Sequence, residues 1–169
     1  AALSPVISWQ DRRAHAWLSQ FSARAEEIHR LTGLMLSAHY GASKLRWCLD
    51  HLPAVKTAQA QGHLAMGPLA SFLLFRLLRE RPLLADPANA ARTLLWNLAA
   101  RDWDPTLQTL FGVPGETLPR CVPTRHAFGT LALDDAFVAG RIVELLGWDR
   151  TDAAEAAARL AATWSGAEE

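Results

Sequence analysis

The sequence predicts a helix-rich α/β domain. Several segments repeat apolar residues at the three- and four-residue spacing of a helix, and a few short β-branched or apolar segments suit strands. Half of the 169 residues are hydrophobic and a fifth are charged, which is typical of a globular protein. A chain of this length is sufficient for one domain with a sizeable core.

The N-terminal segment predicts a strand followed by a helix. Residues 5–11 are β-branched before Trp9, which is typical of a strand that ends at a polar turn. From Asp11 onward the apolar residues follow helical spacing. Asp11 is suited to cap this helix at its N-terminus, and Gly33 is suited to end it.

Three further helices are predicted in the first half of the chain. They cover about residues 43–52, 55–61 and 68–80. Proline disfavours helical backbone in the residue before it, so we expect Pro53 to end the first of these helices and Pro82 to end the third.

The most apolar run, "GPLASFLLFRLL" at residues 67–78, predicts a buried core helix. It is shorter than the roughly 20 residues that span a membrane, and Arg76 interrupts it. We therefore expect no membrane segment here.

The second half of the chain predicts shorter elements. Asp86 and Pro87 indicate a turn, and residues 93–98 indicate a strand. "RCVPT" and "AFGTLAL" also indicate short strands, and Pro123 favours a sheet edge for the first of them.

A short helix is predicted between Asp104 and Gly112. Asp104 is its N-cap, Pro105 takes the first helical position and Gly112 ends it. The last part of the chain, residues 134–169, predicts a helical tail with two helices that begin near Asp135 and Asp152.

Charge and processing signals exclude several classes of function. Seventeen basic residues balance seventeen acidic ones, and no basic stripe is present, so we expect no nucleic-acid partner. The start "AALSPVISWQ" lacks the features of a signal peptide, so we expect a cytoplasmic protein. In that compartment Cys48 and Cys121 are expected to be reduced thiols.

Common catalytic and metal-binding motifs are not found. The chain has no GxxxxGKS loop, no GxGxxG after a strand and no HExxH. Glu26 and His29 are three positions apart, as in di-metal helical bundles, but no second matching pair occurs, so we predict no metal site. The residues alone predict a helix-rich domain of unassigned activity.

Three stretches, taken in order, resemble the FGGY family of carbohydrate kinases. They are "SPVISWQDRR" (residues 4–13), "TGLMLSAHYGASKLRWCLDH" (residues 32–51) and "ADPANAARTLLWNLAARDWDPTLQTLFGVPGETLP" (residues 85–119). The resemblance covers about residues 4–131 and has the character of the glycerol kinases within that family.

The resemblance implies a fold and partners. Residues 1–133 would be part of the family's N-terminal domain, a ribonuclease H-like fold of the actin superfamily, and residues 134–169 an added helical tail of unassigned origin. It implies ATP and Mg²⁺ as cofactors of the parent kinase, with neither bound tightly by this chain. It also implies a polyol or sugar as substrate and the rest of the kinase as partner, and it leaves homo-oligomerisation open.

The resemblance also implies a substrate site. The implied substrate-binding residues are Trp9, Gln10, Asp11, His39 and Tyr40. Trp9 would lie against the carbon face of a polyol, and the loop at residues 37–43 would approach it. Glycerol kinases carry a tyrosine where His39 stands, so the resemblance leaves open which polyol or sugar is bound.

Other residues of the same motifs are expected to have structural roles. Lys44 and Arg46 are interpreted as solvated helix charges. Asn89, Arg92 and Thr93 match a family motif, and we expect them to be structural.

Two parts of the family's catalytic machinery are not found in this sequence. They are a Gly-Thr-rich phosphate hairpin after the first strand and a Gly-Asp pair whose aspartate would be the general base. Phosphoryl transfer needs both phosphate donors and a base near the hydroxyl, so we assign no catalytic residue and predict that the isolated chain is inactive. The alternative is a degenerate, non-catalytic kinase domain that acts as a protein-interaction or structural module.

Overall fold

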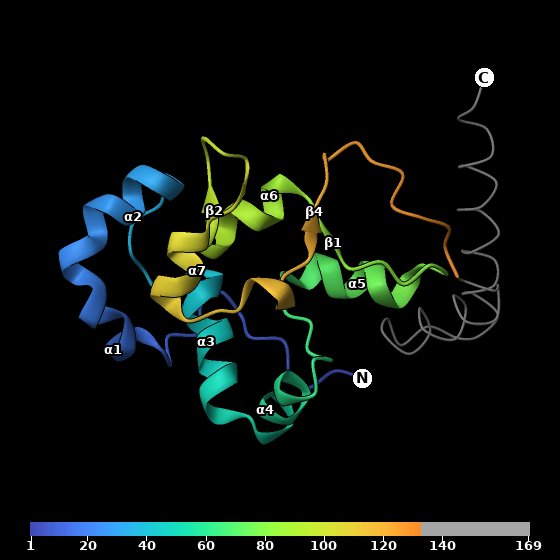
Figure 1. Ribbon diagram of the computed structural model, residues 1–169, viewed down its shortest axis with the longest axis horizontal. Coiled ribbons are helices and arrows are strands. Elements are labelled where there is room, and N and C mark those ends of the chain that lie inside the picture. Colours follow the sequence, from blue (N-terminus) through green and yellow to red (C-terminus); the bar gives the residue numbers. More distant parts are fainter. Residues whose placement is uncertain (133–169) are drawn as a thin grey trace, which may run out of the picture. The chain divides into compact units, whose positions relative to one another are not determined.

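A computed structural model describes residues 1–132 of the chain (Figure 1). These residues belong to two compact units. The first comprises residues 1–76 and 81–128, and the second comprises residues 77–80 together with residues from 129 onward. The predicted helical tail, residues 134–169, lies outside the described residues.

Helices make up most of the regular structure. They are α1 (His15–Leu18), the 3₁₀ segment η1 (Ser19–Arg24), α2 (Ala25–Thr32), α3 (Gly41–His51), α4 (Pro53–Ala60), α5 (Leu69–Leu77), α6 (Pro87–Ala90), the 3₁₀ turn η2 (Ala91–Thr93), α7 (Pro105–Phe111) and the 3₁₀ turn η3 (Gly115–Thr117). The helix-rich class predicted from the sequence is confirmed.

The strands are short and form two small sheets in the first unit. Strand β1 (Leu84–Ala85) pairs in parallel with β4 (Arg120–Cys121). Strand β2 (Trp96–Asn97) pairs antiparallel with β3 (Asp102–Trp103), and the facing Trp96 and Trp103 rings meet edge to face at 5.8 Å between centroids.

Two apolar clusters hold the first unit together. The first cluster contains Leu18, Ile28, Ala38, Ala42, Leu94, Leu95, Leu107, Phe111, Val113 and Leu118. The second cluster contains Cys48, Leu49, Val55, Leu64 and Met66. In the first cluster the fully buried Phe111 ring meets Phe21 edge to face, with 5.2 Å between the ring centroids.

Several predicted helix boundaries are confirmed. Asp104 caps α7, since its carboxylate accepts a hydrogen bond of 3.0 Å from the Leu107 amide. Gly112 then ends α7 in the left-handed conformation that glycine favours, with φ of +60°. Helix α3 ends at His51, two residues before Pro53, and Gly33 ends α2 in the same left-handed way.

The strand predicted at residues 5–11 is wrong. Residues 5–8 have no regular structure, and Trp9 and Gln10 form a turn in which the Asp11 amide donates to the Ser8 carbonyl at 3.1 Å. Val6 is 67% exposed, so its β-branched side chain gains nothing from burial that would hold a strand in place.

The single helix expected between Asp11 and Gly33 is also wrong. It is divided into α1, η1 and α2, and the residue before α1 is Ala14. Asp11 does not cap this helix because its carboxylate is bound by the backbone amide and the guanidinium of Arg13.

The strands expected in the second half are shorter than predicted. Residues 91–93 form η2, and Leu94 adopts a left-handed backbone with φ of +63°, so extended pairing begins only at Trp96. Asp86 and Pro87 begin α6 and do not form an isolated turn, because the Asp86 carboxylate accepts from the Asn89 amide at 3.2 Å.

In "RCVPT" only Arg120 and Cys121 form a strand. The described part of "AFGTLAL", residues 127–132, contributes an isolated antiparallel bridge from Leu131 to Leu78 in the second unit and no longer strand. Both cysteines are free thiols, as predicted.

Residues 67–78 were predicted to form a helix that is buried in the core. The predicted burial is wrong. Helix α5 forms, but the side chains of Leu69, Phe72, Leu73 and Phe75 are exposed, and Ser71 is its buried residue. High hydrophobicity all round a short helix carries no information about which side the core covers. None of the helices in residues 1–132 combines the length and apolar character that a membrane crossing requires.

Because Phe111 is buried in the first cluster and Leu73 of α5 is exposed, truncating the two side chains should lower the stability by different amounts. Phe111→Ala should lower the free energy of unfolding by about 3–5 kcal/mol, the usual loss for a buried aromatic ring. Leu73→Ala should lower it by less than about 0.5 kcal/mol, as at most surface positions. Urea denaturation of both variants measures this, and a larger loss for Leu73→Ala than for Phe111→Ala would contradict the assignment of the core.

Candidate functional site

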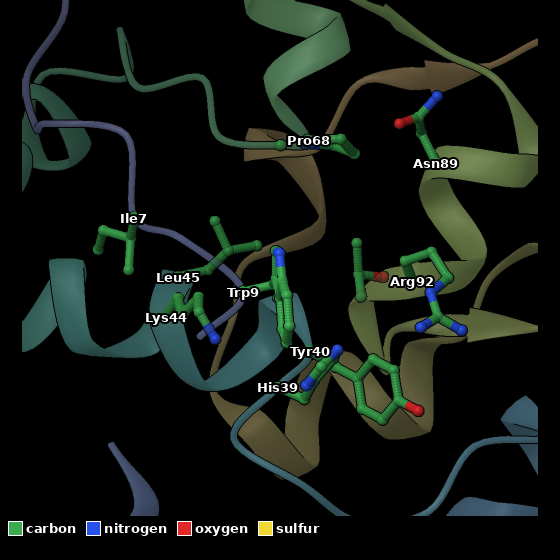
Figure 2. Close-up of a pocket in the computed structure, with 12 residues that line it drawn as sticks. Ile7, Trp9, His39, Tyr40, Lys44, Leu45, Pro68, Asn89 and Arg92 are labelled. Carbon is green, nitrogen blue, oxygen red and sulfur yellow. The ribbon is translucent and has the colours of Figure 1, made fainter. Parts of the chain in front are cut away.

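A cavity of about 420 Å³ lies within the first unit (Figure 2). Four parts of the chain line it: Ile7 and Trp9 near the N-terminus, the loop before α3 with the first turn of that helix, Gly67 and Pro68 before α5, and residues of α6 and η2. Its volume is within the range of about 300–1,000 Å³ that is usual for small-molecule sites.

Trp9 and His39 share this cavity although thirty positions separate them in sequence. Their ring centroids are 4.5 Å apart with the planes tilted by 46°, and the His39 ring meets Tyr40 edge to face at 5.5 Å. The Trp9 side chain lines the cavity. Trp9 is 59% exposed and belongs to neither apolar cluster. The expectation that both rings face one pocket agrees with the structure, and Figure 2 shows them side by side.

The start of α3 is held close to η2, which brings two walls of the cavity together. A Cβ atom on Gly41 would lie 3.3 Å from the Cα atom of Thr93, a tight contact, so glycine at this position favours the close approach of the two backbones. The next two residues, Ala42 and Ser43, are fully buried. This packing fixes where His39 and Tyr40 lie, because they directly precede the helix.

Lys44 is a buried lining residue, and its interpretation as a solvated helix charge is wrong. Only 7% of it is exposed, and its ammonium donates a short hydrogen bond to the Ala38 carbonyl. Burial lowers the pKa of this ammonium, and the carboxylate of Asp11 opposes the shift. Lys44 lies on the side of α3 that faces the loop preceding this helix. The amphipathic pattern of the helix alone does not reveal that this side is covered.

Arg46 is not a freely solvated charge either. Its guanidinium forms an ion pair with Asp50 one turn later and donates a hydrogen bond of 3.0 Å to the Gly112 carbonyl. It thereby joins α3 to the end of α7 and lies outside the cavity lining.

The motif at residues 89–93 contributes to the cavity as well as to the fold. Thr93 has the structural role that was expected, since its hydroxyl donates to the Ala90 carbonyl at 2.7 Å and accepts from the Leu95 amide at 3.2 Å. The Asn89 side chain donates to Asp86 at 2.6 Å. Asn89 and Thr93 nevertheless line the cavity, and so does Arg92, whose guanidinium carbon lies 5.0 Å from the centre of the Tyr40 ring.

Gln10 and Asp11 are not lining residues of this cavity. Gln10 is exposed, and its backbone amide donates to the Ser8 hydroxyl at 3.2 Å. The Asp11 carboxylate is paired with Arg13 at 2.7 Å, and the hydrogen bonds from Arg13 lower the pKa of Asp11 to about 2. The structure therefore brings together Trp9, His39 and Tyr40 from the predicted set and does not include Gln10 or Asp11 in the lining.

The lining combines rings, hydrogen-bonding groups and cations. Lys44 and Arg92 are its positively charged members, and no aspartate or glutamate is among the lining residues. Within residues 1–132 no three His, Cys, Asp or Glu side chains gather closely enough to hold a metal ion. Such a lining suits a ligand with hydroxyl groups and a carbon face.

Comparison with known proteins relates the chain to one family. Residues 1–147 match the model of the N-terminal domain of the FGGY family of carbohydrate kinases. A glycerol kinase of Paracidovorax citrulli is 38% identical over 139 residues, which are 81% of this chain and 27% of that protein. Glycerol kinase 1 of Pseudomonas aeruginosa is 35% identical over 147 residues, 86% of this chain and 29% of that protein.

Solved structures give a consistent result. The structure of Plasmodium falciparum glycerol kinase with ADP matches with a TM-score of 0.72 and 26% identity, over 78% of this chain and 26% of that one. The xylulose kinase of Rhodospirillum rubrum matches with a TM-score of 0.66 and 23% identity, over 88% of this chain and 29% of that one, which shows the fold alone. The chain thus spans between a quarter and a third of the length of these relatives.

Proposed function

The chain belongs to the FGGY family of carbohydrate kinases, and from this premise we propose that it forms the polyol-facing part of an ATP-dependent kinase that phosphorylates a hydroxyl of glycerol or a sugar. Its fold is a helix-rich part of the family's ribonuclease H-like, actin-superfamily domain. Activity and substrate are properties of a longer protein in the relatives, so both are proposals for this chain.

The observation that carries the proposal is the contact between Trp9 and His39. The two rings come from separate family motifs and meet at 4.5 Å in one cavity. A packed core alone does not require this contact, because Trp9 and His39 are both exposed and belong to neither apolar cluster. Two exposed rings that converge on a cavity are better explained by a ligand than by stability.

The chemistry of the lining supports a polyhydroxy ligand. The indole face of Trp9 offers an apolar surface to the carbon–hydrogen side of a polyol, while the imidazole of His39 can donate or accept a hydrogen bond at a hydroxyl. The Tyr40 hydroxyl and the Asn89 amide are further hydrogen-bond donors and acceptors in the lining. The role of Gln10 and Asp11 in binding stays a prediction from the resemblance.

ATP and Mg²⁺ are proposed for the whole kinase and not for this chain. The cavity lining has no carboxylate, the described residues have no cluster that suits a metal ion, and the sequence has no Gly-Asp pair. The residues present do not fit a nucleotide–metal complex, so we derive no step of phosphoryl transfer from them. The second candidate function is a degenerate, non-catalytic kinase domain that acts as a protein-interaction or structural module, and the lack of these groups in the described residues favours it.

Other proposals concern the wider protein. The remainder of a kinase is the proposed partner, a cytoplasmic location is also a proposal, and homo-oligomerisation stays open. A division at residue 133 also stays a proposal, since the family match continues to residue 147.

We expect the 169-residue chain alone to show no ATP-dependent phosphorylation of glycerol, pentoses or hexoses, because it offers neither the phosphate hairpin nor the base of its family. ADP release and sugar phosphate are measured together, with a full-length glycerol kinase as the positive control and a mock preparation as the background. Formation of ADP in proportion to sugar phosphate above the mock preparation would overturn this expectation.

The proposed pocket is tested by ligand binding. Glycerol should shift the backbone amide resonances of Gly41 and Thr93 in a ¹⁵N NMR titration, and Trp9→Ala should weaken this binding about 3- to 10-fold, the loss expected when one ring contact is removed. His39→Ala should act in the same direction. His63→Ala, at an exposed histidine outside the lining, is the matched control. Unchanged glycerol affinity in both Trp9→Ala and His39→Ala would contradict the proposed pocket.

A further inference from the structure

Residues 4–10 contribute one of the four walls of the cavity, yet their backbone makes few hydrogen bonds. Ile7 and Trp9 both line the cavity. Within the described part of the chain, no backbone group of residues 1–7 takes part in a hydrogen bond, and the first such bond belongs to the turn at residues 8–11. A segment held by so few backbone hydrogen bonds opens locally at a low free-energy cost.

Side chains hold this segment at two places. At one place the Trp9 ring meets the His39 ring, with 4.5 Å between the centroids. At the other place Ile7 packs against the second apolar cluster, while it also lines the cavity. Because Ile7 and Trp9 are two positions apart, the segment cannot leave one place without disturbing the other.

The same segment helps to cover a thiol of the second cluster. Cys48 of α3 is 5% exposed. Burial raises the pKa of this thiol, and a hydrogen bond with the Ser4 side chain and the charge of Arg13 oppose the shift. Ser4 and Ile7 are also the two residues of the first ten that are partly buried. Both are therefore part of the cover of Cys48, and both belong to the segment that forms the cavity wall.

The C-terminal end of the segment is fixed to α3. The Asp11 carboxylate accepts a hydrogen bond of 3.0 Å from the backbone amide of Arg13 and one of 2.7 Å from its Nη2 atom. The guanidinium carbon of Arg13 lies 4.4 Å from the centre of the Trp47 ring, which belongs to α3. A movement of residues 4–10 would therefore turn about this anchored end.

We propose that residues 4–10 form a strap that opens as one unit about the anchor at Asp11 and Arg13, and that this opening uncovers the cavity and Cys48 together. A ligand in the cavity can contact Ile7 and Trp9 only while the strap is closed. Ligand binding should therefore hold the strap closed and protect the thiol, since linked equilibria act on each other reciprocally. The strap itself follows from the contacts above, and its response to a ligand rests on the proposed polyol pocket.

The reactivity of Cys48 measures how often the strap is open. Cys121→Ser leaves Cys48 as the one thiol of the chain, and all variants below carry this change. The thiol is labelled with dithiobis-nitrobenzoate at one fixed pH, and the released thionitrobenzoate is followed by its absorbance. Local opening exposes little surface, so the labelling rate should change little with urea below the unfolding transition.

Variants at the cavity end test whether the strap opens as one unit. Trp9→Ala should speed the labelling of Cys48 about 2- to 10-fold, the weight of one aromatic pair, without lowering the urea midpoint of unfolding. His39→Ala should act in the same way, although His39 lies outside the strap. Val6→Ala is the matched control, because Val6 lies in the strap, is 67% exposed and does not line the cavity. It should leave the labelling rate unchanged.

Three results would overturn the strap. They are an unchanged labelling rate in both Trp9→Ala and His39→Ala, an equal increase in Val6→Ala and Trp9→Ala, and a labelling rate that rises with urea as steeply as global unfolding does.

Glycerol separates the strap from the function proposed for the cavity. It should slow the labelling of Cys48, with half of the effect at the concentration that half-shifts the amide resonances of Gly41 and Thr93. Glycerol that shifts these resonances without slowing the labelling would overturn the coupling between ligand and strap. Glycerol that does not bind would overturn the polyol pocket, while the variants, which are measured without any ligand, would still decide whether the strap exists.

Discussion

The packing of α3 against both apolar clusters is the constraint on which the site depends. Ala42 belongs to the first cluster, Cys48 and Leu49 belong to the second, and Leu45 packs against both while it also lines the cavity. Figure 1 shows α3 alongside α7, which it also contacts through Arg46. A helix fixed on two sides cannot shift without disturbing one cluster, and this rigidity holds its first turn against η2.

The sequence was sufficient to predict elements whose start and end are determined by residues within the element itself. The helix α7 is one example, since Asp104, Pro105 and Gly112 determine its start and end within nine positions. The strand expected at residues 5–11 and the buried α5 were wrong because both depended on which surfaces meet in space. Val6 and Leu73 are apolar, yet nothing in their local pattern shows that they remain exposed.

Part of the candidate site was also predictable from the sequence. Family motifs indicated Trp9, His39 and Tyr40, and these rings do line one cavity. Lys44 was interpreted as a solvated helix charge, and Arg92 was expected to be structural because it matches a family motif. Their position in the cavity follows from the close approach of Gly41 to Thr93, a contact over more than fifty positions of sequence that no local pattern contains.

The proposed pocket depends on the segment carrying Trp9 and the loop before α3 meeting in one cavity. A ¹H NOESY spectrum of the unliganded chain tests it most directly, because the ring centroids of Trp9 and His39 are 4.5 Å apart. We expect cross-peaks between the indole and imidazole protons of this pair. The stacked rings of Trp47 and His51, with centroids 4.7 Å apart on the same helix, serve as the positive control. Cross-peaks for the control pair without any between Trp9 and His39 would show that the two segments do not meet in one cavity.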